Sequence, residues 1–212
     1  MNNTLATFKP ELYYHVYNRT NNKEDLFSDD EDKFYFISLT KQYLQIVLDV
    51  FAYSILDNHF HLCIKIKNEK VIRNSLIKIH PKNRTSIMKL FLDSDFNQES
   101  LHCLVSHQFS RMFNCYTKSI NKKNNRKGNL FNRPFKRSQI DLEFAFKLKI
   151  YYLHHNARHH GIVDDFMSHE WNSYNEIWIN EKSIIDTDKV IKLFGGRDNF
   201  QEFHNQKLLP TD

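Results

Sequence analysis

The stretch VFAYSILDNHFHLCIKIK, residues 50–67, decides the fold of this chain. Its second half alternates with a period of two, which is typical of a β-strand with one buried face and one open face. The apolar face holds Phe60, Leu62, Ile64 and Ile66, and the other face holds His59, His61, Cys63, Lys65 and Lys67. The first half also alternates, and a turn at Asp57-Asn58 separates the two runs, so we expect an antiparallel hairpin.

The segments on either side of this hairpin mix strand and helix patterns. Residues 12–19 are rich in aromatic and β-branched side chains, which favours a further strand. Elsewhere apolar residues recur at helical spacing. The predicted helices run from a cap at Ser28 or Asp29 to about Leu48, over about 71–79, over 100–123 and over about 141–155. We therefore predict an α+β fold.

The composition limits the chemistry. A chain of 212 residues that is 41% hydrophobic and 26% charged can bury the core of one domain. Its 4 glycines form neither common glycine-rich phosphate loop, which excludes nucleotide-driven chemistry on those two scaffolds. The net charge of +5 favours an anionic partner such as a nucleic acid. Three cysteines without a CxxC pair, and no signal-peptide or membrane-spanning pattern, predict a cytoplasmic protein.

His59 and His61 are candidate metal ligands. Because alternate residues of a strand point the same way, both imidazoles lie on one face, roughly 6–7 Å apart along the strand. Two neutral imidazoles hold a divalent metal when a third ligand arrives from elsewhere in the fold. The alternative is a pair of polar residues on a solvent-facing strand. His15 shares a face with neighbouring tyrosines, and we interpret it as a structural residue or a nucleic-acid contact.

Among the 10 tyrosines, Tyr152 is the candidate nucleophile. It lies in the helical segment KIYYLHHN, and Asn156 follows four residues later on the same helix face. A phenolate can attack phosphorus, and an amide oxygen can complete a metal site with two histidines. The alternative is a boundary tyrosine and an asparagine near a helix end. Tyr116 lies in the middle of an apolar stripe, which favours a place in the core.

A basic loop with embedded aromatic residues, 121–137, is the candidate nucleic-acid contact. Phe131 and Phe135 either stack on bases or pack beneath the loop. A solvated run of surface charge is the alternative interpretation. The candidate cations are Lys122, Lys123, Arg126, Lys127, Arg133, Lys136 and Arg137, and Arg158, His159 and His160 are further candidates for phosphate contact.

Six motifs occur in a fixed order: YYHVYNR at 13–19, NHFHL at 58–62, GNLFNRPFKR at 128–137, YLHHN at 152–156, ARHHG at 157–161 and W-N-S-Y at 171–174. Together they resemble the single-tyrosine HUH transposases, particularly the REP-associated tyrosine transposases. The resemblance covers about residues 12–175. The chain departs from it at Ala157, where the family usually has proline, and at Pro134, where arginine is frequent.

The resemblance implies a ferredoxin-like antiparallel sheet with helices on one face and the histidine pair on the central strand. It implies that Tyr152 cleaves and rejoins single-stranded DNA beside hairpins through a 5′-phosphotyrosine, and that His59, His61 and Asn156 bind Mg²⁺ or Mn²⁺. It also implies one catalytic domain over 1–180, a variable insertion at about 68–100 and an extension at 181–212. A monomer or a homodimer is expected, with no nucleotide cofactor and no membrane partner.

Two other functions stay open. One is a catalytically silent protein that recognises DNA by sequence or structure. The other is a metal-dependent phosphodiesterase that uses water in place of Tyr152. The presence of both histidines, the tyrosine and the asparagine favours the strand transferase.

Overall fold

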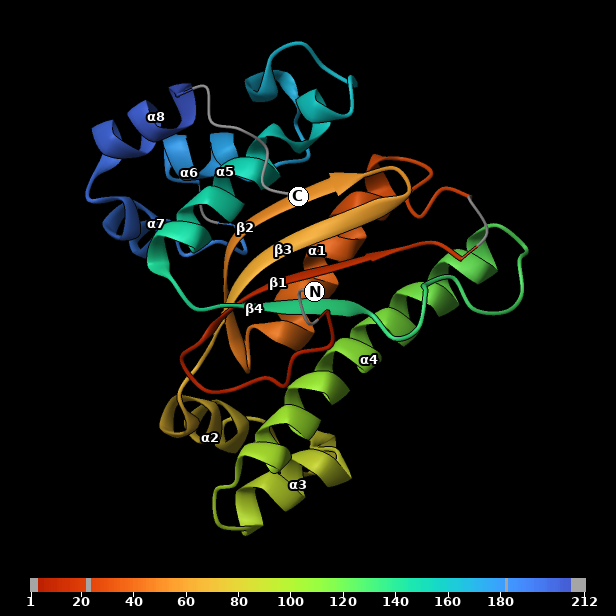
Figure 1. Cartoon of the computed structure of the whole chain (residues 1–212). Helices are drawn as coiled ribbons and strands as arrows, with labels where there is room; N and C mark the ends of the chain where they lie inside the picture. Colours follow the sequence, from red (N-terminus) through yellow and green to blue (C-terminus); the bar gives the residue numbers. More distant parts are fainter. Residues whose placement is uncertain (1–3, 22–23, 182, 207–212) are drawn as a thin grey trace.

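A four-stranded antiparallel sheet forms the centre of the computed structural model, which describes residues 4–21, 24–181 and 183–206 (Figure 1). The strands are β1 (Tyr13–Arg19), β2 (Leu48–Leu56), β3 (His59–Ile66) and β4 (Lys136–Ile140), in the order β2-β3-β1-β4. β2 and β3 form the predicted hairpin, and β1 pairs with β3 on its other side. The α+β class and the antiparallel sheet are confirmed.

One face of the sheet packs against α1 (Asp30–Leu44) and α4 (Gln98–Lys123). The apolar residues of β3 point into this core, and all four are buried as the alternation predicts. Asp29 caps α1 by accepting a hydrogen bond from the Asp32 N–H at 3.0 Å, and acidic residues of the first turn complement the helix dipole. The helix ends at Leu44 rather than near Leu48, because Leu48 already belongs to β2.

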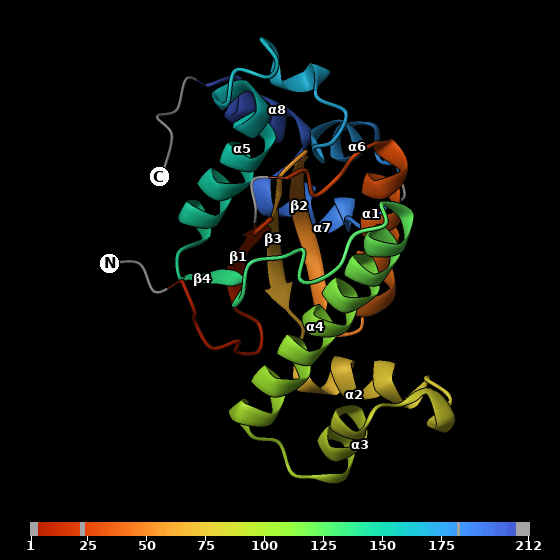
Figure 2. The same ribbon diagram turned by 90° about the vertical axis from the view of Figure 1, so that its right-hand side faces the viewer.

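The other face is covered by α5 (Glu143–His159), which contacts β2 and β3 (Figure 2). The expectation of helices on one face is therefore too narrow. The physical reason lies in β2, where residues 50–56 are all buried, so both sides of the strand need a cover. On α5, Phe146, Ile150 and Leu153 are buried, whereas Leu142 precedes the helix and is exposed.

Residues 68–100 add helices at the far part of α4, away from α5 (Figure 1). They form α2 (Glu69–Ile77), a short 3-10 helix (Pro81–Asn83) and α3 (Ser86–Asp93), and α3 packs on both α2 and α4. The helix expected at about 71–79 is present as α2, which begins at Glu69 and ends at Ile77. In α4 the predicted apolar stripe is buried in full, from Leu101 to Ile120.

The chain after α5 returns along the sheet and ends in three helices. A 3-10 helix (Phe166–Ser168) precedes α6 (Tyr174–Ile179), α7 (Thr187–Phe194) and α8 (Arg197–Asn205), which gather beside α5 (Figure 1). Of the predicted extension 181–212, residue 182 and residues 207–212 lie outside the described residues. Among the helices that are described, none is both long and apolar enough to cross a membrane.

Neighbouring segments hydrogen-bond to both outer strands of the sheet. Along β2, the Ile55 N–H donates to the Trp171 carbonyl at 2.8 Å, and the Ser173 N–H donates to the Tyr53 carbonyl at 3.1 Å. Beside β4, the Ala6 N–H donates to the Arg137 carbonyl at 3.1 Å. These contacts satisfy backbone groups that an outer strand otherwise exposes.

Candidate functional site

The histidine pair of β3 lies on the sheet face that α5 covers. The ring centroids of His59 and His61 are 5.1 Å apart, and their planes are nearly perpendicular at 88°. His15 joins them from β1, with its Nε2 at 2.9 Å from Nδ1 of His61. His15 is thus a direct neighbour of the pair, and we call His15, His59 and His61 the sheet cluster.

Hydrogen bonds orient the two imidazoles of β3. Nδ1 of His59 lies 2.5 Å from Oδ1 of Asn58, an oxygen that only accepts, so this Nδ1 carries the proton. Nδ1 of His61 shares a proton with His15. Both contacts use Nδ1, and Nε2 is the nitrogen that remains for a metal ion. Metal-binding histidines commonly use their other nitrogen in this way.

Burial keeps the sheet cluster neutral. It lowers the pKa of His59 to about 4, with smaller contributions from His160 and Arg19. It lowers the pKa of His15 to about 3 and that of His61 well below its ordinary value of 6.5, and Lys149 acts in the same direction on both. Because only neutral imidazole offers a lone pair, these histidines are competent metal ligands at neutral pH.

α5 places Tyr152 and Asn156 against the same sheet face. The half-buried Tyr152 ring meets the His61 ring edge to face, with centroids 6.4 Å apart. Asn156 is fully buried, and its Nδ2 donates to Oγ of Ser54 at 3.4 Å. Ser54 is the register partner of His61 on the neighbouring strand. The predicted nucleophile and the predicted third ligand therefore lie beside the histidine pair.

The donor set suits a divalent cation. Oδ1 of Asn156 is buried and has no hydrogen-bond partner among the described residues, so it is an acceptor in need of a donor or a cation. Two imidazole nitrogens and one amide oxygen are ligands that Mg²⁺ and Mn²⁺ tolerate. In the part of the chain that is described, no three His, Cys, Asp or Glu side chains form a metal-binding group. A site here therefore depends on the asparagine.

Two further tyrosines define the alternatives to Tyr152. Tyr116 is fully buried on the opposite side of the sheet, and its hydroxyl donates to the Leu26 carbonyl at 2.8 Å. Burial, followed by the nearby Asp32 and Asp29, raises its pKa, so it does not ionise readily. Tyr17 of β1 does lie beside His61, with ring centroids 5.6 Å apart. Sequence reasoning did not consider Tyr17 as a nucleophile, although alternation along β1 already places it on the face of His15.

Three cations of the predicted basic loop form contacts within the protein, although one of them, Lys123, is also exposed. Lys123 forms ion pairs with Asp29 at 2.6 Å and Asp32 at 2.8 Å, and Arg126 pairs with Glu24. Arg137 is half-buried, because its Nε donates to the Ala6 carbonyl at 2.8 Å and its guanidinium covers two phenylalanine rings. Exposed side chains remain at Lys122, Lys127, Arg133 and Lys136, and the last of these belongs to β4 rather than to a loop.

Phe131 and Phe135 pack beneath the loop. Phe131 is buried against Phe113, with ring centroids 4.6 Å apart, and Phe135 packs on Phe109 at 4.9 Å. The alternative of direct stacking on bases therefore does not apply to Phe131 in this conformation. A hollow of about 360 Å³ lies over Phe113, Phe131 and Phe135.

A cleft of about 810 Å³ opens directly beside the sheet cluster. Its lining includes His59, Arg19 at the end of β1, Asn132 from the loop before β4, and His160 after α5. The rings of His59 and His160 lie 5.5 Å apart. Arg19 and Asn132 were not selected from the sequence, although both lie inside quoted motifs. Asp25 and Asp57 also line the cleft, so it carries charges of both signs, with Arg19 as the cation nearest to the end of β1.

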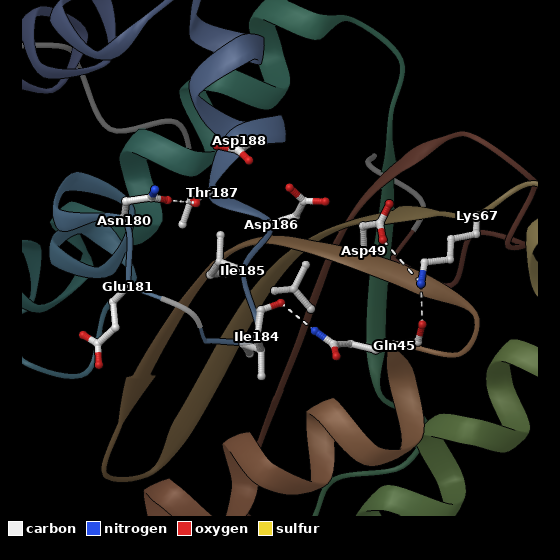
Figure 3. Close-up of a pocket in the computed structure, with 11 residues that line it drawn as sticks. Gln45, Asp49, Lys67, Asn180, Glu181, Ile184, Ile185, Asp186, Thr187 and Asp188 are labelled. Atoms are coloured by element: carbon white, nitrogen blue, oxygen red, sulfur yellow. Dashed lines mark hydrogen bonds and ion pairs between the residues drawn. The ribbon is translucent and has the colours of Figure 1, made fainter. Parts of the chain in front are cut away.

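A second hollow, at the other end of the β2–β3 hairpin, has the opposite character (Figure 3). Its volume is about 480 Å³, and it is lined by one cation, Lys67, which pairs with Asp49 at 3.5 Å, and by four carboxylates: Asp49, Glu181, Asp186 and Asp188. The nearby Lys189 is already paired with Asp49 at 2.8 Å and with Asp186 at 2.9 Å. Like charges repel DNA phosphates, so this hollow is not a candidate nucleic-acid site.

A second group of histidines lies on the far side of α5. Nδ1 of His204, on α8, donates to the Phe200 carbonyl at 2.7 Å, so its Nε2 accepts from Nδ1 of His154 at 2.8 Å. Nε2 of His154 then accepts from Oγ of Ser173 at 2.9 Å. We call His154, Ser173 and His204 the inner cluster. All three are buried, and they join α5 to α8 and to the segment along β2.

Comparison of the chain with known proteins gives one informative result. No model of a known protein family matches the sequence, and no curated protein sequence matches it. Among solved structures, a REP-associated tyrosine transposase bound to a REP hairpin is similar in fold, with a TM-score of 0.53. The match covers 84% of this chain and 86% of that one, at 13% sequence identity. At this identity the comparison establishes a shared fold.

Proposed function

We propose that this chain nicks and rejoins single-stranded DNA beside hairpins, as a metal-dependent tyrosine transposase. The observation that carries the proposal is the contact of Tyr152 on α5 with His61 on β3, one helical turn before the buried Asn156. The similar fold of a tyrosine transposase that was solved with a hairpin supports the choice of substrate.

In the proposed reaction, the phenolic oxygen of Tyr152 attacks the scissile phosphorus in line. The new oxygen–phosphorus bond forms as the bond to the 3′ oxygen of the preceding nucleotide breaks. The phenolic proton passes to solvent, and the departing 3′ oxygen takes up a proton. The products are a 5′-phosphotyrosine and a free 3′ hydroxyl. Attack by another 3′ hydroxyl reverses the step and rejoins strands, so the reaction needs no nucleotide.

His59, His61 and Asn156 would hold the Mg²⁺ or Mn²⁺ of this reaction. A bound divalent ion supplies positive charge beside the phosphate oxygens, where negative charge grows as the phosphorus is attacked. Burial keeps the two imidazoles unprotonated, so that each can bind the ion. Asn58 and His15 hold the imidazole rings in a fixed orientation.

The DNA strand would enter through the cleft beside His59. Arg19 lines this cleft, and the exposed cations Lys122, Lys127, Arg133 and Lys136 would contact the backbone nearby. Lys123 at the end of α4, Arg126 in the loop and Arg137 in β4 form internal contacts, so we assign them a structural role rather than DNA binding.

The test is formation of a covalent protein–DNA adduct. A hairpin oligonucleotide with a single-stranded flank is incubated with the protein and Mn²⁺ and then analysed by denaturing electrophoresis. We expect an adduct that disappears with EDTA and in Tyr152→Phe. Tyr17→Phe and Tyr116→Phe are the matched controls, because each removes one phenolic oxygen from a different position.

Each other outcome points to a different function. Loss of the adduct in Tyr17→Phe with retention in Tyr152→Phe would assign the nucleophile to Tyr17. Cleavage without an adduct would indicate a phosphodiesterase that uses water. Hairpin binding without cleavage would indicate a silent DNA-binding protein.

A further inference from the structure

Lys149 lies next to the proposed nucleophile on α5. It precedes Tyr152 by three residues, and residues at this spacing share a helix face. Its Nζ lies over the Tyr152 ring, 4.7 Å from the centroid. The side chain is half-buried. A cation is therefore held against the phenol ring in a partly dehydrated position, where its charge acts more strongly than on an open surface.

The charge of Lys149 also reaches the sheet face below α5. It adds to burial in lowering the pKa of His15 and of His61, and it opposes the rise that burial causes in the pKa of the Cys63 thiol. These three side chains lie on neighbouring rungs of β1 and β3. The ammonium group lies over the Tyr152 ring, and that ring in turn meets the His61 ring edge to face.

We propose that Lys149 binds the DNA phosphate that Tyr152 attacks and stabilises the negative charge that accumulates on it. This inference rests on the proposed function. Three N–H donors on a positive centre suit a non-bridging phosphate oxygen, and a charge that is already in place needs no reorganisation when the phosphorus is attacked. The same contact would hold the phosphotyrosine until a 3′ hydroxyl arrives.

Lys147 on the same helix is the matched control. Its Nζ pairs with Glu143 at 3.1 Å and lies 6.0 Å from the Phe194 ring centroid, on the side of α5 that faces α7. Removal of either lysine changes the net charge and the helix composition equally. Only Lys149 is beside Tyr152.

The experiment measures single-turnover adduct formation by Lys149→Met, Lys149→Arg and Lys147→Met, with the hairpin substrate and Mn²⁺. We expect the maximal rate of Lys149→Met to fall about 100-fold, with a smaller change in the DNA concentration that gives half the maximal rate. Lys149→Arg should recover most of the loss because the charge is retained. Lys147→Met should stay within about twofold of the unmodified protein.

Three results would overturn the inference. Equal rates for Lys149→Met and Lys147→Met would show that the charge does not act on the reaction. A loss that Lys149→Arg does not recover, together with a lower unfolding temperature, would show a packing role. If the unmodified protein forms no adduct, the proposed function fails and the role of Lys149 fails with it. The first two results leave the proposed function intact.

Discussion

In the inner cluster, each ring nitrogen of His154 and His204 has a protein partner, and the chain of hydrogen bonds ends on the Phe200 carbonyl. In the sheet cluster, the hydrogen bonds of His59 and His61 engage Nδ1. Both clusters are neutral because burial lowers the pKa of their histidines. A structural histidine and a candidate metal ligand therefore differ in whether the second ring nitrogen already has a protein partner, and not in burial or in pKa.

The largest expected effect is that of His61→Ala on activity. Loss of one metal ligand should lower the rate of adduct formation by about 1,000-fold or more, because the ion supplies several kcal/mol of charge stabilisation. The rate is measured with saturating DNA and Mn²⁺. An active His61→Ala protein would place this histidine with the structural ones.

His154→Ala should act on stability. The substitution opens a cavity, removes the hydrogen bond from Oγ of Ser173 and leaves Nε2 of His204 without its partner, at a cost of about 3 kcal/mol. Thermal unfolding followed by circular dichroism should show a midpoint about 6–12 °C lower. His61→Ala is the comparison, and we expect it to lower the midpoint less. The reverse order would contradict the distinction between the two clusters.

His15→Phe should give an intermediate effect, since it keeps a ring but removes the hydrogen bond to Nδ1 of His61. Loss of such a partner weakens metal binding by about 10–100-fold. Mn²⁺ binding by calorimetry and the Mn²⁺ dependence of adduct formation both measure it. His80→Phe, at an exposed and remote position, is the control and should leave both unchanged. Unchanged Mn²⁺ affinity in His15→Phe would exclude a supporting role for His15.

The smallest expected effect is the pH dependence that His204 contributes. Burial lowers its pKa to about 3 from an ordinary 6.5, so the unfolded chain binds its proton before the folded chain does. Stability should therefore fall as the pH drops from about 6.5 towards 3, by up to about 1.4 kcal/mol per pH unit. Urea unfolding at pH 7, 6 and 5 measures this slope. His204→Phe should flatten it, and parallel curves for the two proteins would exclude His204 as the titrating group.

Sequence patterns predicted the parts of the fold in which one face of an element is buried. The apolar stripe of α4 is of this kind and is confirmed. The four apolar residues of β3 are buried as predicted, but Cys63 on the face predicted to be open is buried as well. The alternation of residues 50–57 predicted a strand with one buried face, but residues 50–56 of β2 are all buried, so this pattern did not reveal the cover that α5 provides. The second covered face was therefore missed.

The candidate site follows the same division. Spacing alone predicted that His59 and His61 share one face of a strand and that Tyr152 and Asn156 share one face of a helix. The structure shows that these two faces lie against each other. Contacts between distant segments had no local signal. Lys123 meets Asp29 and Asp32 across more than 90 residues of sequence, so its pairing could not be separated from that of its exposed neighbour Lys122.

The segments that lie along β2 and β4 restrict how two copies of this chain can meet. Residues 171–173 hydrogen-bond to one outer strand, and residues 4–6 hydrogen-bond to the other. A second copy that pairs with either strand at these positions must first displace one of these segments. A homodimer that keeps this conformation therefore leaves residues 53–55 of β2 and Arg137 of β4 bonded within their own chain.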